Sequence, residues 1–482
     1  MQTRPCNTPI MTPHSLASTL QAIVGDEHVL VDDDVRRGYE TDWTGRYSGP
    51  STCVVRPGTT AEVSAVLVAC AVAGADVVPQ AGNTGLVGGS VPRPRPREGH
   101  PTVVLSLRRL DAITDIDTTA MQLTAGAGVT IADWQSAARA AGLDTPIDFA
   151  ARDSATIGGA IATNAGGSRV VRYGTMRQQI VGVEAVLADG KVVGSLAGLA
   201  KETVGLHWPS VLAGSEGTLA VVTAARLRLV PRFEHVVTVM LTATNIDEAV
   251  ALAGRLRRSV PSLDAIEIIQ PDALRLVAEH VGTKPPVDAP GGSTVLLVEC
   301  ADHVDPTDDL VAQLDGPEVI GTAVATDAPH RAALVAFRDR ITEAINAASA
   351  TAGAPPFKLD VAVPVGAVGR LLELADDAAR SDGCRLIAFG HLAEGNLHLN
   401  HLGVRDPDAL ADRVLRGVAD LGGTISAEHG VGIAKTKWLH LVRSPDDLAA
   451  QAAIKSALDP LGMLNPGVLD AGVHHDAVGQ VP

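Results

Sequence analysis

The chain has 482 residues, of which 46% are hydrophobic, and a formal net charge of −16. This length and composition allow a large core and predict two or more domains. The negative charge argues against non-specific binding to nucleic acid or to an anionic membrane surface. No apolar run reaches the roughly 18 residues of a membrane helix, so no membrane span is expected.

The cysteines and the N-terminus bear on the compartment. An odd number of cysteines, scattered and without a C-x-x-C pair, fits a reducing compartment better than a disulfide framework. Their spacing also argues against a cysteine-ligated iron–sulfur cluster. Residues 1–13 lack the charged start and apolar core of a signal peptide, and their single arginine gives little support to a mitochondrial presequence. We therefore predict a cytoplasmic protein.

From about residue 15 to residue 231, helices alternate with short strands and glycine is frequent. Thr59 and Thr60 can cap a helix that runs to Ala73, and a strand over residues 76–79 leads into a glycine-rich loop. Further along this half, we predict two strands and an alanine-rich helix, at residues 103–107, 122–125 and 131–141.

Three glycine-rich loops lie in this first half, at residues 79–90, 157–167 and 214–218. Glycine permits positive φ and close backbone approach, and successive N–H groups in such loops can bind phosphate oxygens. The side chains of Asn83, Thr84 and Ser90 could help. Three loops within one region indicate a large, extended cofactor, whereas an ordinary surface loop is the alternative for each.

Two common nucleotide sites lack their motifs. No G-x-G-x-x-G lies between a strand and a helix, so a Rossmann NAD site is unsupported. No G-x-x-x-x-G-K-[ST] is present, which argues against a P-loop NTPase. A nucleotide with a redox-active ring, held by a non-Rossmann fold, remains.

After Pro231, helices and strands interleave, which predicts an α+β sheet layer with helices on one side. The expected helices cover residues 246–258, 273–281, 331–348 and 368–379, and the expected strands cover residues 266–269, 294–299, 319–325 and 358–363. A last helix over residues 445–458 leads into a compact turn over residues 459–467.

Two histidines lie at the ends of the segment HLAEGNLH, which reads as the turn of a hairpin between strands at residues 384–389 and 397–402. Alternation along the second strand places His398 and Asn400 on one face. Two structural histidines in a turn are the alternative.

Glu428 and His429 follow about 30 residues further on and favour a site over this alternative. His391, His398 and Glu428 form a ligand set that suits a divalent transition metal with one position left open for substrate. His429, beside the carboxylate, could move a proton near neutral pH.

Together these motifs resemble the FAD-linked 2-hydroxy acid dehydrogenases of the vanillyl-alcohol-oxidase-type superfamily, and most closely the D-2-hydroxyglutarate dehydrogenases. The resemblance covers roughly residues 29–467. It rests on the segments PQAGNTGLVGGSVP, IGGAIATNAGGSRVVRYG, VEAVLADG, GSEGTLAVVTAARLRLVP, GHLAEGNLHLN, SAEHGVG and DPLGMLNPG.

The resemblance implies an α+β fold in three parts. Residues 15–232 would form a PCMH-type FAD-binding domain of two α+β subdomains. Residues 233–440 would form an α+β substrate or cap domain with the metal site, and residues 441–470 a helical segment that returns to the FAD domain.

FAD would be non-covalent, because the first glycine loop contains no histidine and no suitable Tyr or Cys lies nearby. By resemblance the first loop holds the pyrophosphate, the second follows the flavin and ribityl chain, and the third approaches the adenine. The expected cofactor-binding residues are Gln80, Gly82, Asn83, Thr84, Gly85, Gly89, Ser90, Ile157, Gly158, Gly159, Ala162, Asn164, Gly166, Gly167, Gly174, Gly217, Val222 and Asn465.

The resemblance also assigns roles at the catalytic centre. His391, His398 and Glu428 would hold zinc, or manganese, and His429 would be the base. Arg338, Thr342, Lys358 and Asn400 would bind the substrate. Arg338 and Thr342 share a helix face at i, i+4 in an R-x-x-x-T element, and Lys358 opens a K-x-D element. An Arg with a Lys fits a dicarboxylate.

The implied reaction is oxidation of a D-2-hydroxy acid, most closely D-2-hydroxyglutarate to 2-oxoglutarate, with hydride transfer to flavin N5. The implied partners are the small-molecule substrate and an electron acceptor such as electron-transfer flavoprotein, and a homodimer is compatible. Alternatives are a D-lactate, glycolate or D-malate dehydrogenase, a non-catalytic flavin subunit, and a metal-dependent hydrolase with structural glycine loops.

Overall fold

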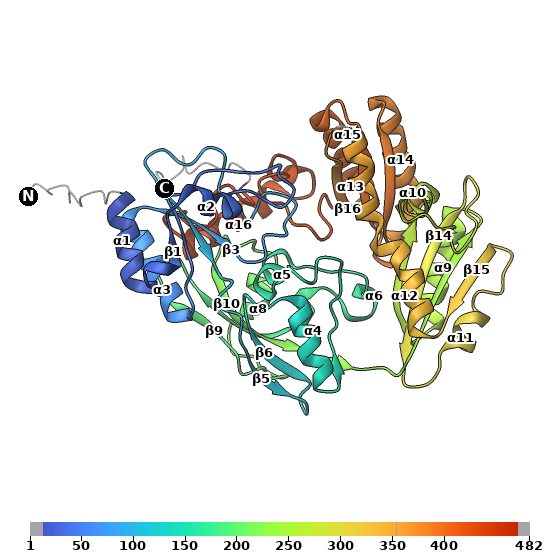
Figure 1. The fold of residues 1–482 in the computed structure, drawn as a ribbon, viewed down its shortest axis with the longest axis horizontal. Coiled ribbons are helices and arrows are strands. Elements are labelled where there is room, and N and C mark those ends of the chain that lie inside the picture. Colours follow the sequence, from blue (N-terminus) through green and yellow to red (C-terminus); the bar gives the residue numbers. More distant parts are fainter. Residues whose placement is uncertain (1–12, 353, 471–482) are drawn as a thin grey trace, which may run out of the picture.

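The structure, a computed structural model, describes residues 13–352 and 354–470. The first half of the chain builds two larger sheets and a two-stranded one on one side of the molecule, and the second half builds a seven-stranded sheet on the other (Figure 1). The last helix, α16 (Pro445–Leu458), returns to the first half, where it is drawn in red near the blue α2 (Asp33–Glu40). A capping box at Ser444 and Asp447 starts α16 where the sequence predicts a helix.

The first sheet has the order β1-β2-β4-β3, with β1 antiparallel to β2 and the other neighbours parallel. Its strands are β1 (Val29–Leu30), β2 (Cys53–Val55), β3 (Asp76–Gln80) and β4 (Thr102–Ser106). Helices α1 (Pro13–Val24) and α3 (Thr60–Ala73) share its core. The predicted helix from Thr60 to Ala73 is present: the Thr59 side chain caps its start, and Gly74 ends it in the left-handed conformation.

The second sheet is antiparallel, with the order β5-β6-β10-β8-β9. Its strands are β5 (Ile113–Asp117), β6 (Gln122–Gly126), β8 (Ile180–Val186), β9 (Val192–Ser195) and β10 (Val221–Arg228). Its helices are α4 (Ile131–Ala140), α5 (Ile157–Thr163), α6 (Val170–Tyr173), α7 (Met176–Gln179) and α8 (Trp208–Leu212), and β7 (Leu143–Asp144) pairs with β11 (Val230–Pro231). The fully buried Trp134 lies in the core between this sheet and α4.

The third sheet is antiparallel throughout, with the order β15-β12-β14-β13-β17-β18-β16. Its strands are β12 (His235–Ala243), β13 (Leu263–Ile269), β14 (Thr294–Asp302), β15 (Val319–Ala325), β16 (Phe357–Ala362), β17 (Arg385–His391) and β18 (Asn396–Leu402). The hairpin predicted around the two histidines is formed by β17 and β18.

Helices cover both faces of this third sheet, so the expectation of helices on one side is wrong. One hydrophobic core joins the sheet to α9 (Ile246–Ser259), α14 (Val368–Asp382) and α15 (Pro407–Asp420). A second core, on alternate residues of the same strands, joins it to α10 (Pro271–Val281), α12 (Ala328–Asp339) and α13 (Ile341–Ala352). Both faces of the strands are apolar, which a one-sided sheet would not need. The remaining short helices are η1 (Asp26–His28), α11 (Thr307–Ala312), η2 (Val365–Ala367), η3 (Leu392–Glu394) and η4 (Thr436–Leu441).

The single helix expected over residues 331–348 is two helices. Arg340, at φ −86° and ψ 3°, leaves the helical conformation between α12 and α13. Phe337 of the first helix and Ile341 of the second are both buried in the core that includes α10. Packing on α10 therefore sets a bend that local helical propensity does not encode.

A buried carboxylate joins the two halves of the molecule. Glu216, in the third glycine loop, accepts the backbone N–H groups of Val431 and Gly432 at 2.7 and 2.8 Å. Asn465, beyond α16, donates to the carbonyl oxygens of Glu216 and of Gly89 in the first glycine loop. Two glycine loops, the segment after His429 and the C-terminal turn thus form one hydrogen-bonded seam.

Within residues 13–352 and 354–470, no helix is both long and apolar enough to cross a membrane. The four cysteines in these ranges, Cys53, Cys70, Cys300 and Cys384, are free thiols, as the scattered spacing predicts.

Candidate active site

A cavity of about 930 Å³ lies between the glycine loops and the third sheet. One wall consists of residues from the first two glycine loops and from the segment after Gly214. The facing wall carries side chains from β13, β16, β17, β18 and α12, together with Glu428 and His429. The cavity thus joins the part of the molecule expected to bind a cofactor to the part expected to bind a metal.

Most of the expected cofactor-binding residues line this cavity: Gln80, Gly82, Asn83, Thr84, Gly85, Gly89, Ser90, Gly158, Gly159, Ala162, Gly166, Gly167, Gly217 and Val222. The Asn83 and Ser90 side chains bond to each other at 2.9 Å, so they brace the first loop.

Four of the expected cofactor residues lie behind the lining. Ile157 is fully buried in the core of the second sheet. Asn164 accepts hydrogen bonds from Thr175 and Arg177, and Gly174 ends α6 at φ 78°. Asn465 belongs to the seam described above.

Two glycines show how closely the backbone of this wall is packed against neighbouring segments. A Cβ on Gly82 would lie 2.3 Å from the carbonyl oxygen of Ser154, in the segment that leads into the second loop. Gly167 has φ 104°, and a Cβ there would lie 2.1 Å from the carbonyl oxygen of Asp148. Neither position accepts a larger residue unless the backbone moves. The volume and this glycine-rich wall fit an extended dinucleotide such as FAD.

The register of four neighbouring strands builds the opposite wall. His391 on β17 pairs with Glu267 on β13. His398 on β18 pairs with Asp360 on β16, and Asn400 pairs with Lys358. Because paired residues point to the same face of a sheet, each histidine has a carboxylate beside it.

One ligand atom each from His391, His398 and Glu428 lies within 4.8 Å of the others, which fits the three-ligand set of a divalent metal. His391 Nε2 is 3.4 Å from Glu428 Oε1. Glu428 Oε1 also accepts the N–H of Gly167 at 2.8 Å, so the candidate metal ligand touches the second glycine loop directly. Burial would raise the pKa of Glu428, but the neighbouring histidines lower it, so the carboxylate is charged at neutral pH.

Glu267 orients His391 from behind. Its carboxylate is 2.5 Å from His391 Nδ1 and 2.6 Å from Arg338 Nε. Burial opposes the charge of Glu267, yet His391 and Arg338 hold the pKa of this carboxyl below its ordinary value. With Nδ1 directed to Glu267, the Nε2 of His391 faces Glu428, as a metal ligand should.

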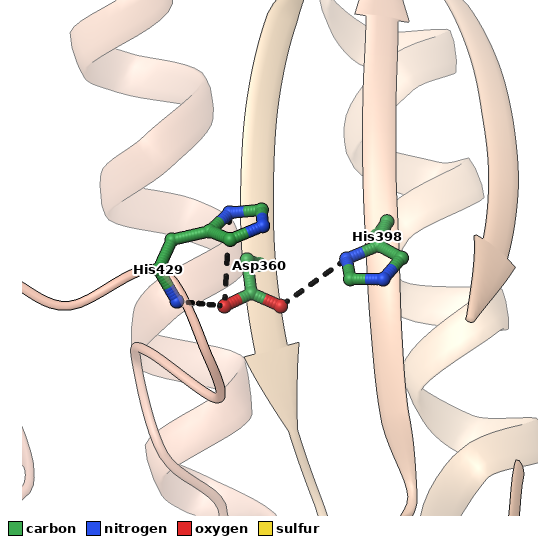
Figure 2. Close-up of side chains that lie close together, drawn as sticks. All are labelled: Asp360, His398 and His429. Atoms are coloured by element: carbon green, nitrogen blue, oxygen red, sulfur yellow. Dashed lines mark hydrogen bonds and ion pairs between the residues drawn. The ribbon is translucent and has the colours of Figure 1, made fainter. Parts of the chain in front are cut away.

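Asp360 plays the same role for two other histidines: it lies between His398 and His429 and contacts both (Figure 2). Its Oδ1 lies 3.3 Å from His398 Nδ1 and accepts the amide of Asn396 at 2.8 Å. Its Oδ2 accepts three successive backbone N–H groups, those of residues 427, 428 and 429, at 3.1, 2.7 and 3.1 Å. Burial opposes ionisation, but the neighbouring histidines hold the pKa of Asp360 well below its ordinary value. This carboxylate therefore fixes both a candidate ligand and the segment that carries Glu428.

His429 stacks on His398, with ring centroids 5.5 Å apart and an interplanar angle of 10°. Its Nδ1 is 3.8 Å from Asp360 Oδ2. Burial lowers the pKa of His429 despite Asp360, so the ring is mainly neutral near pH 7. A neutral imidazole in the cavity wall can accept a proton.

The four expected substrate-binding residues, Arg338, Thr342, Lys358 and Asn400, line the same cavity. Arg338, at the end of α12, lies over the Phe389 ring with Cζ 4.6 Å from its centroid. Thr342 lies on α13, so the bend at Arg340 separates two residues expected on one helix, yet both reach the cavity. Lys358 lies with Nζ 5.8 Å from the centroid of the Trp43 ring.

Three carboxylates of the site lie outside the predicted set. The sequence places Asp360 only in a substrate-holding K-x-D element, but its oxygens accept hydrogen bonds from Asn396 and from the backbone of Glu428. Glu267 and Glu216 were not predicted. Glu267 is the one acid in the otherwise apolar segment AIEII (residues 265–269), and an acid in such a run is the signal that could have found it.

Comparison with protein families agrees with this arrangement. Residues 51–195 match the family described as FAD binding domain, and residues 232–469 match the one described as FAD linked oxidases, C-terminal domain. A rice protein named probable D-2-hydroxyglutarate dehydrogenase, mitochondrial, is 32% identical over 461 residues, which cover 93% of this chain and 80% of that protein. A D-2-hydroxyglutarate dehydrogenase of Xanthomonas citri is 33% identical over 463 residues, covering 92% and 94%.

Among solved structures, one of p-cresol methylhydroxylase superposes with a TM-score of 0.75 at 16% identity, covering 95% of this chain and 96% of that one. The chain therefore belongs to the FAD-linked oxidase family. It has the PCMH-type fold and is a flavin-dependent oxidoreductase, as the sequence motifs predict.

The expected cytoplasmic location is contradicted by these comparisons, because the matched plant and animal relatives are named as mitochondrial proteins. That expectation rested on the lack of a secretory signal and on free cysteines, which do not distinguish the cytoplasm from another reducing compartment. Residues 1–13, on which the expectation of no signal sequence rests, lie almost wholly outside the described residues.

Proposed function

We propose that the enzyme oxidises D-2-hydroxyglutarate, or a closely related D-2-hydroxy dicarboxylate, to the 2-oxo acid. The observation that carries this proposal is the position of two cations, Lys358 and Arg338, in the same cavity as the His391, His398 and Glu428 cluster. Lys358 forms no ion pair with a carboxylate of the described residues. One end of the cavity can thus bind a hydroxy acid, and cations can bind a second carboxylate. The names of relatives about 32% identical, and the D stereochemistry in them, support the choice.

We infer that His391, His398 and Glu428 hold a divalent metal, zinc or manganese, and that the glycine loops hold FAD without a covalent bond. When bound, the metal would polarise the substrate's hydroxyl and α-carboxylate, and FAD would accept the hydride. The loop residues that line the cavity are the proposed FAD contacts, with Ile157, Asn164, Gly174 and Asn465 supporting them.

The protein's own groups then act as follows. His429, neutral and directed into the cavity, takes the hydroxyl proton as the hydride leaves Cα. Asn400 and Thr342 offer hydrogen bonds to the substrate, and Lys358 and Arg338 hold it by charge. Asp360 and Glu267 do not contact the substrate. They hold the histidine rings in place.

We propose that residues 15–232 form the FAD domain, residues 233–440 the substrate domain and residues 441–470 the returning segment. The contacts of α16 and Asn465 with the first half support this division. The proposed electron acceptor is an electron-transfer flavoprotein or similar carrier, and the proposed assembly is a homodimer. Both rest on the family resemblance alone.

A D-lactate dehydrogenase is the second candidate. A relative from Schizosaccharomyces pombe, 32% identical over 92% of this chain, is named putative D-lactate dehydrogenase. The two candidates differ at Lys358, because a monocarboxylate has no second carboxylate to bind. If Lys358→Ala leaves kcat/KM unchanged for both D-lactate and D-2-hydroxyglutarate, the dicarboxylate assignment is wrong.

The test is an anaerobic absorption spectrum before and after D-2-hydroxyglutarate, with the L-isomer and D-lactate as controls and a chelator-treated sample beside them. We expect the visible flavin band to bleach with the D-dicarboxylate, and not after chelation. Bleaching by D-lactate alone would favour the second candidate. A flavin band that no hydroxy acid bleaches would refute both.

A further inference from the structure

A second cavity, of about 520 Å³, adjoins the first. The two share the lining residues Trp43, Leu86, Val87, Lys358 and His429. The rest of the second lining comes from residues 44 and 46, from α13 and the segment after it, and from Asp360 and Lys435. A molecule bound at the metal-ligand cluster could therefore extend past Lys358 into this space.

The side chains that line the second cavity carry a net positive charge, because Arg46, Lys358 and Lys435 face the single carboxylate of Asp360. Among its lining residues, all within the described ranges, Asp360 is the one carboxylate, and its two oxygens accept hydrogen bonds from Asn396 and from three backbone N–H groups. Lys435 donates to the carbonyl oxygens of Asp360 and Ile425. No carboxylate in the described part of the chain pairs with Arg46 or Lys358, and burial and the charge of Arg46 both lower the pKa of Lys358.

Arg46 is placed by a structured turn of the first half of the chain. Asp42 accepts the backbone N–H groups of Arg46 and Tyr47 at 3.0 and 3.1 Å. The guanidinium lies 5.3 Å from the centroid of the Phe357 ring, and Phe357 is the residue before Lys358. Two cations from separate halves of the molecule, the exposed Arg46 and the half-buried Lys358, thus line one cavity, and no carboxylate of the described residues pairs with either, which favours a bound anion.

We propose that Arg46 is a specificity-determining residue, which together with Lys358 binds the substrate carboxylate remote from the reacting carbon in the second cavity. This inference rests on the proposed function, because it requires the hydroxy-acid end of the substrate to lie at the cluster of His391, His398 and Glu428. Free space beyond Lys358 also predicts that D-2-hydroxyadipate, one carbon longer, is accepted, because its distal carboxylate can still meet Arg46.

The first test measures kcat/KM for D-2-hydroxyglutarate and D-lactate in the parent enzyme and in Arg46→Gln, Arg46→Lys and Arg37→Gln. Arg37, an exposed residue of α2, is the matched control. For Arg46→Gln we expect a loss of about tenfold on the dicarboxylate, mainly through KM, and less than about twofold on D-lactate. Arg46→Lys should recover part of the loss, because the charge remains. Equal losses on both substrates, or none, would overturn the proposal.

A binding measurement separates this inference from the proposed function. Glutarate has both carboxylates but no hydroxyl, so its dissociation constant can be measured by calorimetry even if no hydroxy acid reduces the flavin. We expect Arg46→Gln to bind glutarate about tenfold more weakly than the parent enzyme and Arg37→Gln. Unchanged glutarate binding in Arg46→Gln would exclude the proposed role of Arg46. If D-2-hydroxyglutarate does not reduce the flavin but glutarate binding still depends on Arg46, the proposed reaction is wrong and the role of Arg46 stands.

Discussion

Replacing Asp360 with asparagine keeps the shape of the side chain and removes its charge and one of its acceptors. The carboxylate accepts four hydrogen bonds, from three backbone N–H groups on Oδ2 and from Asn396 on Oδ1, and its Oδ1 lies 3.3 Å from His398 Nδ1. An asparagine can direct its oxygen to the backbone groups only if its NH₂ faces Asn396 and His398. The amide of Asn396 then meets another donor, and His398 Nδ1 must present a lone pair instead of a proton.

The magnitude follows from these contacts. The variant loses one hydrogen bond to a charged group and weakens the three to the backbone, which lowers the free energy of unfolding by about 2–4 kcal/mol. The change at His398 moves its proton to Nε2, the nitrogen left for a metal. Loss of such an orienting partner typically costs about 10–100-fold in metal affinity or activity. We therefore expect Asp360→Asn to weaken metal binding and to lower kcat by factors in this range.

The assay measures two quantities. The first is kcat with D-2-hydroxyglutarate and a dye as electron acceptor, and the second is metal affinity, by competition with a chelator. Asp382→Asn is the matched control, because Asp382 also accepts two backbone N–H groups, those of Arg405 and Asp406, away from the cavity. The control should keep the parent's metal affinity and turnover. If Asp360→Asn also keeps both, the carboxylate does not orient His398, and the reasoning from the strand register is wrong.

Three further predictions concern the base, the metal and a buried acid. His429→Gln should lower kcat by about 10²–10⁴ and leave the flavin spectrum intact, and a bound flavin with unchanged turnover would exclude His429 as the base. Dialysis against a chelator should abolish flavin reduction by substrate, and zinc or manganese should restore it; full activity in metal-free enzyme would contradict the metal site. Glu299, half-buried beside Thr238, has its pKa raised to about 7, mainly by desolvation. Its folded state therefore holds a proton that the unfolded state has lost, so stability falls as the pH rises from about 4.5 to 7. In Glu299→Gln the fall in Tm over this pH range should be smaller, by the change in Tm that corresponds to roughly 3 kcal/mol of unfolding free energy. Parallel curves of Tm against pH for parent and variant would refute the raised pKa.

The parts of the site that follow from local pattern could be predicted from the sequence. The strand alternation around His398 places it on the cavity face together with Asn400, and both are there. The glycine loops were recognisable because few segments need so many residues without a Cβ, and Gly82 and Gly167 show the contacts that require it. The cap at Thr59 likewise indicated the start of α3.

The parts that depend on distant pairing could not be predicted in this way. Glu267 meets His391 across 124 residues, and its effect on the ring depends on the register of β13 with β17. Asp360 could be noticed as an acid in a strand, but its bonds to residues 427–429 depend on how a later loop folds back. The bend at Arg340 and the helices on both sheet faces are set by packing, which hydrophobic periodicity along one segment does not report.

The seam at Glu216 limits how this enzyme can open. A hinge between the two halves would separate a buried carboxylate from the N–H groups of Val431 and Gly432, and would pull Glu428 from Gly167. Each hydrogen bond removed from such a buried group costs about 1–3 kcal/mol, so wide opening is a rare event. We therefore expect substrate and product to pass the exposed side chain of Trp43, which lines both cavities, while the two halves of the molecule stay together.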